Sequence, residues 1–113
     1  MTVKELCERL SLKTVCEAEP DREINGAYTG DLLSWVMGRA KSDNVWITIM
    51  SNVNVVAVAT LTEPAAIVLA EGVELQEDAL KSAKENGITL LSTELSAYEI
   101  CAELYKALTE NKQ

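Results

Sequence analysis

The side chains that could do chemistry in this sequence are hydroxyls, amides and carboxylates, because none of its 113 residues is a histidine. The commonest general base and a common metal ligand are therefore missing. The three cysteines, Cys7, Cys16 and Cys101, have no C-x-x-C spacing, whereas a zinc or iron–sulfur site needs about four clustered ligands. Cys7 and Cys101 fall on apolar stripes of expected helices. We predict small buried hydrophobic residues, with no metal and no cofactor.

A set of small polar and acidic residues follows the expected strands or begins an expected helix. In open α/β sheets, ligands bind beyond the carboxyl ends of the strands, where helix N-termini present free amides. Each candidate also has a structural interpretation, such as a helix cap for Asn52 or a positive-φ turn for Gly72. This rim contains no Lys, Arg or His, so it is suited to a neutral or weakly polar ligand, and to a triphosphate only with Mg²⁺. The candidate ligand-binding residues are Thr29, Gly30, Asp31, Ser51, Asn52, Asn54, Glu71, Gly72, Ser92 and Thr93.

Sequence signatures of catalysis are missing. The chain has no phosphate loop, no G-x-S-x-G, no H-E-x-x-H and no EF-hand string. The acid pair Glu77-Asp78 fits the first turn of a helix, where the helix dipole favours negative charge. We expect no catalytic residues; an enzyme could be only carboxylate- or metal-dependent, with Asp31, Glu71 or Glu94 as its acids.

Local patterns predict short helices alternating with strands. Capping boxes begin helices at Thr2-x-x-Glu5 and Ser96-x-x-Glu99, and Asp31 is expected to cap another helix. Residues 17–30 are expected to be irregular, and residues 110–113 to fray. The expected helices are 3–10, 31–37, 53–61, 76–86 and 97–108, and the expected strands are 12–16, 45–50, 65–70 and 88–91.

Residues 51–61 are open to two interpretations. Their valine content favours a hairpin strand, whereas the alternating order of elements favours a buried helix capped by an asparagine. We choose the helix. Strands separated by helices then indicate a single α/β domain over residues 1–113. The predicted fold is a three-layer sandwich, with a mostly parallel or mixed sheet of about four to five strands and helices on both faces.

Charge and hydropathy exclude several kinds of partner. Ten Lys+Arg against eighteen Asp+Glu leave a net charge of −8, which repels nucleic acid and anionic membranes. The N-terminus has no apolar signal region, and the apolar run 65–70 is far short of the roughly 20 residues of a membrane helix. We therefore expect a soluble, cytoplasmic protein. Trp35 and Met37 are candidate interface residues, because aromatic residues and methionine are enriched at subunit contacts.

Several dispersed stretches resemble the DRTGG domain family. The contiguous DRTGG string is absent, and its nearest fragments are Asp21-Arg22 and Thr29-Gly30. The resemblance runs from about Leu10 to Leu108. The matching stretches are 21–26 (DREING), 30–34 (GDLLS), 46–48 (WIT), 54–59 (NVVAVA), 65–69 (AAIVL) and 83–88 (AKENGI).

The resemblance implies an α/β fold similar to the N-terminal domains of HPr kinase/phosphorylase and of the muramoyl-tripeptide ligase, and it favours the helix at 54–61. It also implies regulation and dimer contact, because such domains accompany CBS pairs in larger proteins. Stand-alone members are encoded near iron hydrogenase and redox-complex subunits, which implies a redox partner. Kinase activity is not implied, since this chain lacks the kinase domain and its phosphate loop.

These observations support two main hypotheses. The first is a non-catalytic regulatory or sensor module that acts as a homodimer and can bind a small metabolite or nucleotide at the strand ends. The second is a protein-interaction adaptor that takes no small ligand and docks on a hydrogenase, redox or kinase complex through its acidic surface. A metal-dependent hydrolase is a third and weaker hypothesis.

Overall fold

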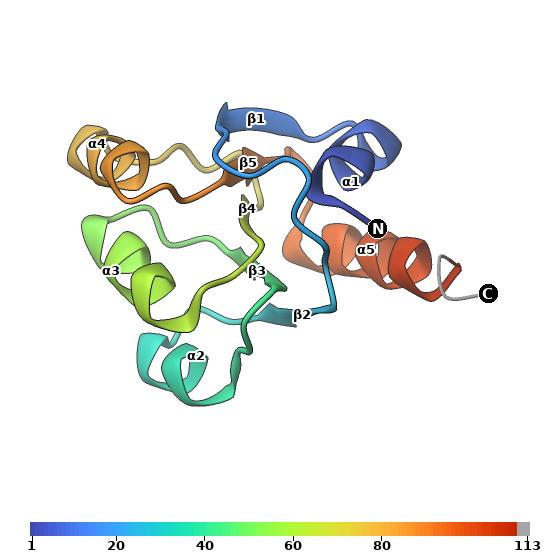
Figure 1. Ribbon diagram of the computed structural model, residues 1–113, viewed down its shortest axis with the longest axis horizontal. Helices are drawn as coiled ribbons and strands as arrows, with labels where there is room; N and C mark the ends of the chain where they lie inside the picture. The colour runs from blue at the N-terminus through green and yellow to red at the C-terminus, as the bar shows by residue number, and fades with distance from the viewer. Residues whose placement is uncertain (111–113) are drawn as a thin grey trace.

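Short helices and strands follow one another along residues 1–110, the part of the chain described by this computed structural model (Figure 1). None of the helices in this part is long and apolar enough to cross a membrane. The fraying predicted for 110–113 lies, beyond Glu110, outside the described residues. The helices are α1 (Val3–Leu10), α2 (Leu33–Arg39), α3 (Val53–Thr62), α4 (Glu77–Glu85) and α5 (Ala97–Glu110), and the strands are β1 (Lys13–Cys16), β2 (Gly26–Thr29), β3 (Asn44–Thr48), β4 (Ala66–Leu69) and β5 (Leu90–Ser92).

The five strands form one mixed sheet in the order β1-β5-β4-β3-β2. Strands β2 to β5 are parallel, so their carboxyl ends lie along one edge of the sheet. Strand β1 runs antiparallel to β5, with Lys13 opposite Ser92. The amino end of β1 therefore lies beside the carboxyl ends of the other strands. The predicted α/β fold with a mostly parallel or mixed sheet is confirmed.

Strand β2 lies inside the stretch that was predicted to be irregular, and that prediction is wrong. The strand pairs in parallel with β3, with Tyr28 opposite Trp46 and Thr29 opposite Ile47. It is a short edge strand between turn residues, and its sequence GAYT contains no long apolar pattern. A four-residue edge strand is stabilised by its partner rather than by its own pattern, and its sequence signal is therefore weak.

Helices cover both faces of the sheet (Figure 1). Alternate residues of β3 point to opposite faces: Val45 and Ile47 pack in the cluster with α1 and α5, and Trp46 packs in the cluster with α2, α3 and α4. Every residue of β4, the central strand, is fully buried, because helices cover both of its faces. The three-layer sandwich is confirmed.

Side chains cap three of the helices as predicted. The Thr2 hydroxyl accepts the Glu5 amide at 3.2 Å, and Glu5 Oε1 accepts the Thr2 amide at 2.9 Å. Ser96 and Glu99 form the same reciprocal box at α5. Asn52 begins α3, where its Oδ1 accepts the Asn54 amide at 3.0 Å. These bonds fix where the three helices start, because they satisfy amides that have no partner inside the helix.

Asp31 does not cap α2, so this prediction is wrong. Helix α2 has Leu32 at its N-cap position, without a side-chain hydrogen bond. Asp31 Oδ1 instead accepts the Thr48 hydroxyl at 2.7 Å and the Ile49 amide at 3.0 Å. The Asp31 carboxylate therefore bonds to the end of β3 instead of to the amides of α2. These bonds hold the segment after β2 against its neighbouring strand.

Helix α4 ends at Glu85, and the turn that closes it extends into residues that the sequence pattern assigns to the next strand. The Ile88 amide donates to the Ala83 carbonyl at 3.0 Å across this turn, in which Gly87 has a φ of +65°. Strand β5 consequently begins at Leu90 rather than at residue 88. Gly87 takes the left-handed conformation that commonly follows the last residue of a helix.

The three free thiols are core residues to different degrees. Cys16 is buried, whereas Cys7 and Cys101 are half-buried and pack against the cluster that contains α1 and α5. Burial raises the pKa of the Cys7 thiol, so its reactive thiolate form is disfavoured. The prediction of small buried residues is confirmed for Cys16, whereas Cys7 and Cys101 are only half-buried.

Candidate functional site

The predicted site residues after β2 take part in bonds between strands. Thr29 donates its hydroxyl to the Ile47 carbonyl at 3.4 Å, and the Gly30 amide donates to the same oxygen at 3.1 Å. The Gly30 carbonyl accepts the indole N–H of buried Trp46 at 2.9 Å. With the Asp31 bonds described above, these residues fasten β2 to β3.

The predicted residues after β3 hold the start of α3 and the segment before α4. Asn52 is the helix cap, and its partner is the Asn54 amide. The Ser51 carbonyl accepts the Gln76 amide at 3.0 Å. These polar residues therefore have structural bonds, and their contact with a ligand stays a prediction.

A pocket of about 420 Å³ lies at the carboxyl ends of β4 and β5. It brings together three of the predicted residues, Gly72, Ser92 and Thr93, whereas the other seven do not line it. We call it the strand-end pocket. Its full lining is Leu10, Ser11, Lys13, Gly72, Val73, Glu74, Ser92, Thr93, Glu94 and Leu95.

Backbone hydrogen bonds build the wall of this pocket. The Gly72 amide donates to the Thr93 carbonyl at 2.9 Å, and the Glu71 amide donates to the Leu95 carbonyl at 2.8 Å. Both Glu71 and Gly72 have left-handed backbone conformations, with φ of +63° and +68°. The turn after β4 is thereby pinned against the segment after β5. The positive φ predicted for Gly72 is confirmed.

The Glu94 carboxylate lies directly against the backbone of Gly72. A Cβ atom at position 72 would overlap the end of the Glu94 side chain and force it to move. Glycine at this position therefore leaves room for an acidic group in the pocket. The Glu71 carboxylate is used elsewhere, since it accepts the Ala97 amide at 3.3 Å at the start of α5.

Sequence reasoning missed Lys13, and the prediction of a rim without cations is wrong for this pocket. Lys13 reaches the pocket because β1 is antiparallel to β5, which puts the first residue of β1 opposite the last residue of β5. The orientation of β1 is set by its pairing with β5, which is more than 70 residues away in the sequence. No local signal in residues 12–16 fixes that orientation.

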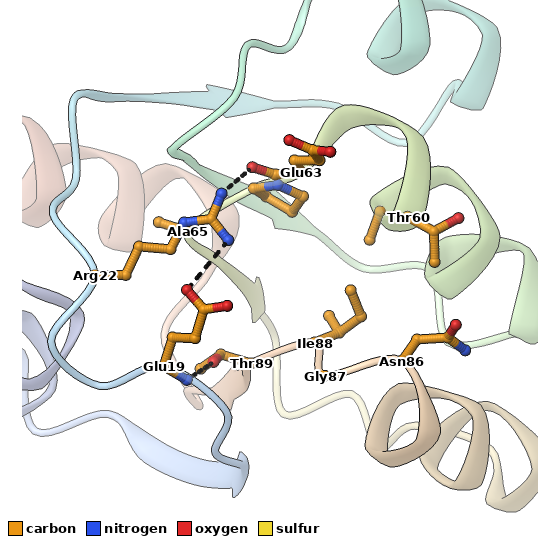
Figure 2. Close-up of a pocket in the computed structure, with 11 residues that line it drawn as sticks. Glu19, Arg22, Thr60, Glu63, Ala65, Asn86, Gly87, Ile88 and Thr89 are labelled. Carbon is orange, nitrogen blue, oxygen red and sulfur yellow. Dashed lines mark hydrogen bonds and ion pairs between the residues drawn. The ribbon is translucent and has the colours of Figure 1, made fainter.

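A second pocket, of about 480 Å³, lies at the opposite edge of the sheet and was not predicted (Figure 2). Arg22 crosses it. Its Nε donates to Asp43 Oδ1 at 2.7 Å, its Nη2 donates to the Glu63 carbonyl at 2.7 Å, and its Nη1 lies 3.8 Å from Glu19 Oε2. The guanidinium thus joins three segments of the chain. The sequence pattern places Arg22 only in a fragment of the DRTGG string.

The candidate interface residues have exposed apolar side chains. Trp35 is 52% exposed and Met37 is 48% exposed, and Leu32 beside them is 59% exposed. The Arg39 guanidinium lies 3.7 Å from the centre of the Trp35 ring, which is the geometry of a cation–π contact. The role of these residues as contacts for another molecule stays a prediction.

The three acids of the hydrolase hypothesis occupy different environments. Asp31 bonds to β3, Glu71 bonds to the start of α5, and Glu94 lines the pocket. Over residues 1–110, no three His, Cys, Asp or Glu side chains gather in a way that could hold a metal ion.

The chain is thus a small α/β domain with a pocket at its strand ends. A comparison with solved structures finds the same α/β fold. The structure matches the crystal structure of the CBS and DRTGG domains of the regulatory region of Clostridium perfringens pyrophosphatase, complexed with its activator diadenosine tetraphosphate. The TM-score is 0.68 and the sequence identity is 14%, over 91% of this chain and 45% of that one. The chain therefore spans less than half the length of the matched region.

At this identity the likeness establishes the fold, and that fold is consistent with a DRTGG domain. The matched structure is a regulatory region. The sequence itself matches no protein-family profile and no curated protein.

Proposed function

We propose that this chain is a non-catalytic regulatory domain that binds a small ligand in the strand-end pocket. The observation that carries the proposal is the structural match, over 91% of the chain, to a regulatory region. The position of the pocket supports it, because ligands of α/β sheets collect at the carboxyl ends of parallel strands. A protein or domain that contacts this chain would then respond to whether the ligand is bound.

The charge of the pocket bears on which ligands it accepts. The matched regulatory region binds an activator with four phosphates. In this chain the pocket has one cation, Lys13, and two carboxylates, Glu74 and Glu94. Phosphates would face like charges, so a polyphosphate ligand would need Mg²⁺ to neutralise them.

The proposal is tested by thermal unfolding in the presence of candidate ligands. The probes are AMP, ATP and diadenosine tetraphosphate, each with and without MgCl₂, together with a mixture of amino acids. A saturable rise in Tm is expected with at least one probe. Ser92→Ala should reduce the rise, because it removes a hydroxyl from the pocket; Ser42→Ala, on an exposed turn, is the matched control. No rise with any probe would contradict the proposal.

A second candidate function is a protein-interaction adaptor, favoured by the exposed apolar side chains of Leu32, Trp35 and Met37. Exposed aromatic and methionine side chains are typical of contact surfaces. We propose that the exposed Trp35 side chain also contacts a second copy of the chain. Light scattering at tens of micromolar should then give a dimer that Trp35→Ala converts to a monomer. A wild-type monomer at that concentration would contradict self-association.

A further inference from the structure

Charges of both signs line the strand-end pocket without being used in ion pairs. Lys13 supplies an ammonium group, and Glu74 and Glu94 supply carboxylates. Within residues 1–110, the ion pairs of 4.0 Å or less join other residues. The pocket therefore offers two separate charged ends to a ligand.

The positive end is formed where β1 meets β5. Lys13 and Ser92 are directly opposite each other in the antiparallel pair, so their side chains stand on the same face of the sheet. Lys13 is exposed and Ser92 is half-buried. An ammonium and a hydroxyl side by side are suited to a single carboxylate, which accepts one hydrogen bond from each.

The negative end is formed by the turn after β4. The Glu94 carboxylate lies against Gly72, in the space that any side chain at position 72 would take. Glu74 lines the same turn. Two carboxylates at this end attract a cation and repel a phosphate, which distinguishes the site from a nucleotide site.

Apolar side chains also line the pocket. Leu10, Val73 and Leu95 line it, and its volume of about 420 Å³ exceeds that of a single amino acid. We propose that the strand-end pocket binds a free α-amino acid with an aliphatic side chain, its carboxylate at Lys13 and Ser92 and its ammonium at Glu94. This inference rests on the proposed ligand-binding function and names the class of ligand.

The test is isothermal titration calorimetry with three matched probes. L-Leucine carries both charges, 4-methylpentanoate lacks the ammonium, and isoamylamine lacks the carboxylate. L-Leucine should bind with at least about tenfold lower Kd than either half-molecule, because each loses one charge-assisted contact. Equal affinity of L-leucine and either half-molecule would overturn the proposal.

Two variants assign the ends of the ligand. Lys13→Met should raise the Kd for 4-methylpentanoate at least about tenfold and leave the Kd for isoamylamine unchanged, whereas Glu94→Gln should do the reverse. Both variants should bind L-leucine more weakly than the wild type does. Lys81→Met and Glu85→Gln, on the exposed side of α4, are matched controls that should bind like the wild type. Both pocket positions are exposed, so circular dichroism should show folded variants.

The outcomes separate this inference from the function on which it rests. Binding of ATP with Mg²⁺ that is lost in Lys13→Met, with no heat from L-leucine, would overturn the amino-acid ligand and keep a regulatory ligand pocket. No binding of any probe would overturn both. Binding of L-leucine that neither pocket variant weakens would place it elsewhere and overturn the site.

Discussion

Two glycines have left-handed backbones, and only one of them has a neighbour that an added side chain would contact. Comparing them separates the free-energy cost of the backbone conformation from that of the side-chain contact. Gly72 has a φ of +68° and faces the Glu94 side chain, whereas Gly87 has a φ of +65° and has nothing within 4 Å of an added Cβ. Because the group near Gly72 is the end of a flexible, exposed side chain, it can move aside. The two positions therefore share the same backbone penalty and differ in what a side chain displaces.

We expect Gly72→Ala and Gly87→Ala each to lower the free energy of unfolding by about 1–2 kcal/mol, the cost of a left-handed non-glycine residue. Urea denaturation of both variants measures it. Only Gly72→Ala should also weaken ligand binding, because it displaces the Glu94 carboxylate. A much larger loss of stability in Gly72→Ala than in Gly87→Ala would show that Glu94 cannot move.

At the scale of elements, α3 depends on its cap more than on an amphipathic pattern. Its residues are apolar on nearly all sides, with Val55, Val56, Val58 and Ala59 buried, so hydrophobic periodicity does not define its start. Asn52 defines it through the bond to the Asn54 amide. The same valine-rich segment could pair as a strand, and the cap is one of the features that favour the helix.

Asn52→Ala should accordingly lower the free energy of unfolding by about 1 kcal/mol, because the amide of Asn54 loses its acceptor. Asn52→Ser keeps a capping oxygen and should lose much less. Thermal or urea unfolding of the two variants checks this. Equal losses would mean that the side-chain bond contributes nothing to the helix start.

Elements whose signals are local could be predicted from sequence. The capping boxes at Thr2 and Ser96, the buried strand around Ile67 and the helix end at Gly87 all depend on neighbours within a few residues. Strand β2 and the orientation of β1 depend on partners far along the chain. For the same reason the sequence could place Gly72, Ser92 and Thr93 at the strand ends but could not place Lys13 beside them.

At the scale of the whole molecule, the two capping boxes belong to helices of one layer. Helices α1 and α5 cover the same face of the sheet and contact each other. Hydrogen bonds from the Thr2 and Ser96 amides hold the pKa of Glu5 and of Glu99 below the ordinary value of 4.5. Acid should therefore act on this layer through both helix starts.

The sign of the effect follows from the lowered pKa values. A carboxylate with a lowered pKa in the folded state contributes stability above pH 4.5 and loses it as the pH falls through the folded-state value. The double variant Glu5→Gln/Glu99→Gln should lose less stability than the wild type between about pH 6 and pH 3. Urea denaturation at the two pH values measures it, and identical losses in both proteins would contradict the expectation.

The antiparallel pairing of β1 with β5 joins the beginning of the chain to a strand near its end, since Lys13 lies opposite Ser92. One wall of the strand-end pocket comes from residues 10–13 and another from residues 92–95. A ligand that contacts both walls would stabilise the pairing of β1 with β5 and oppose the separation of β1 from the edge of the sheet. Amide hydrogen exchange in β1 would then slow when a ligand binds. The N-terminal segment would be the part of the molecule whose stability depends most on whether the pocket is occupied.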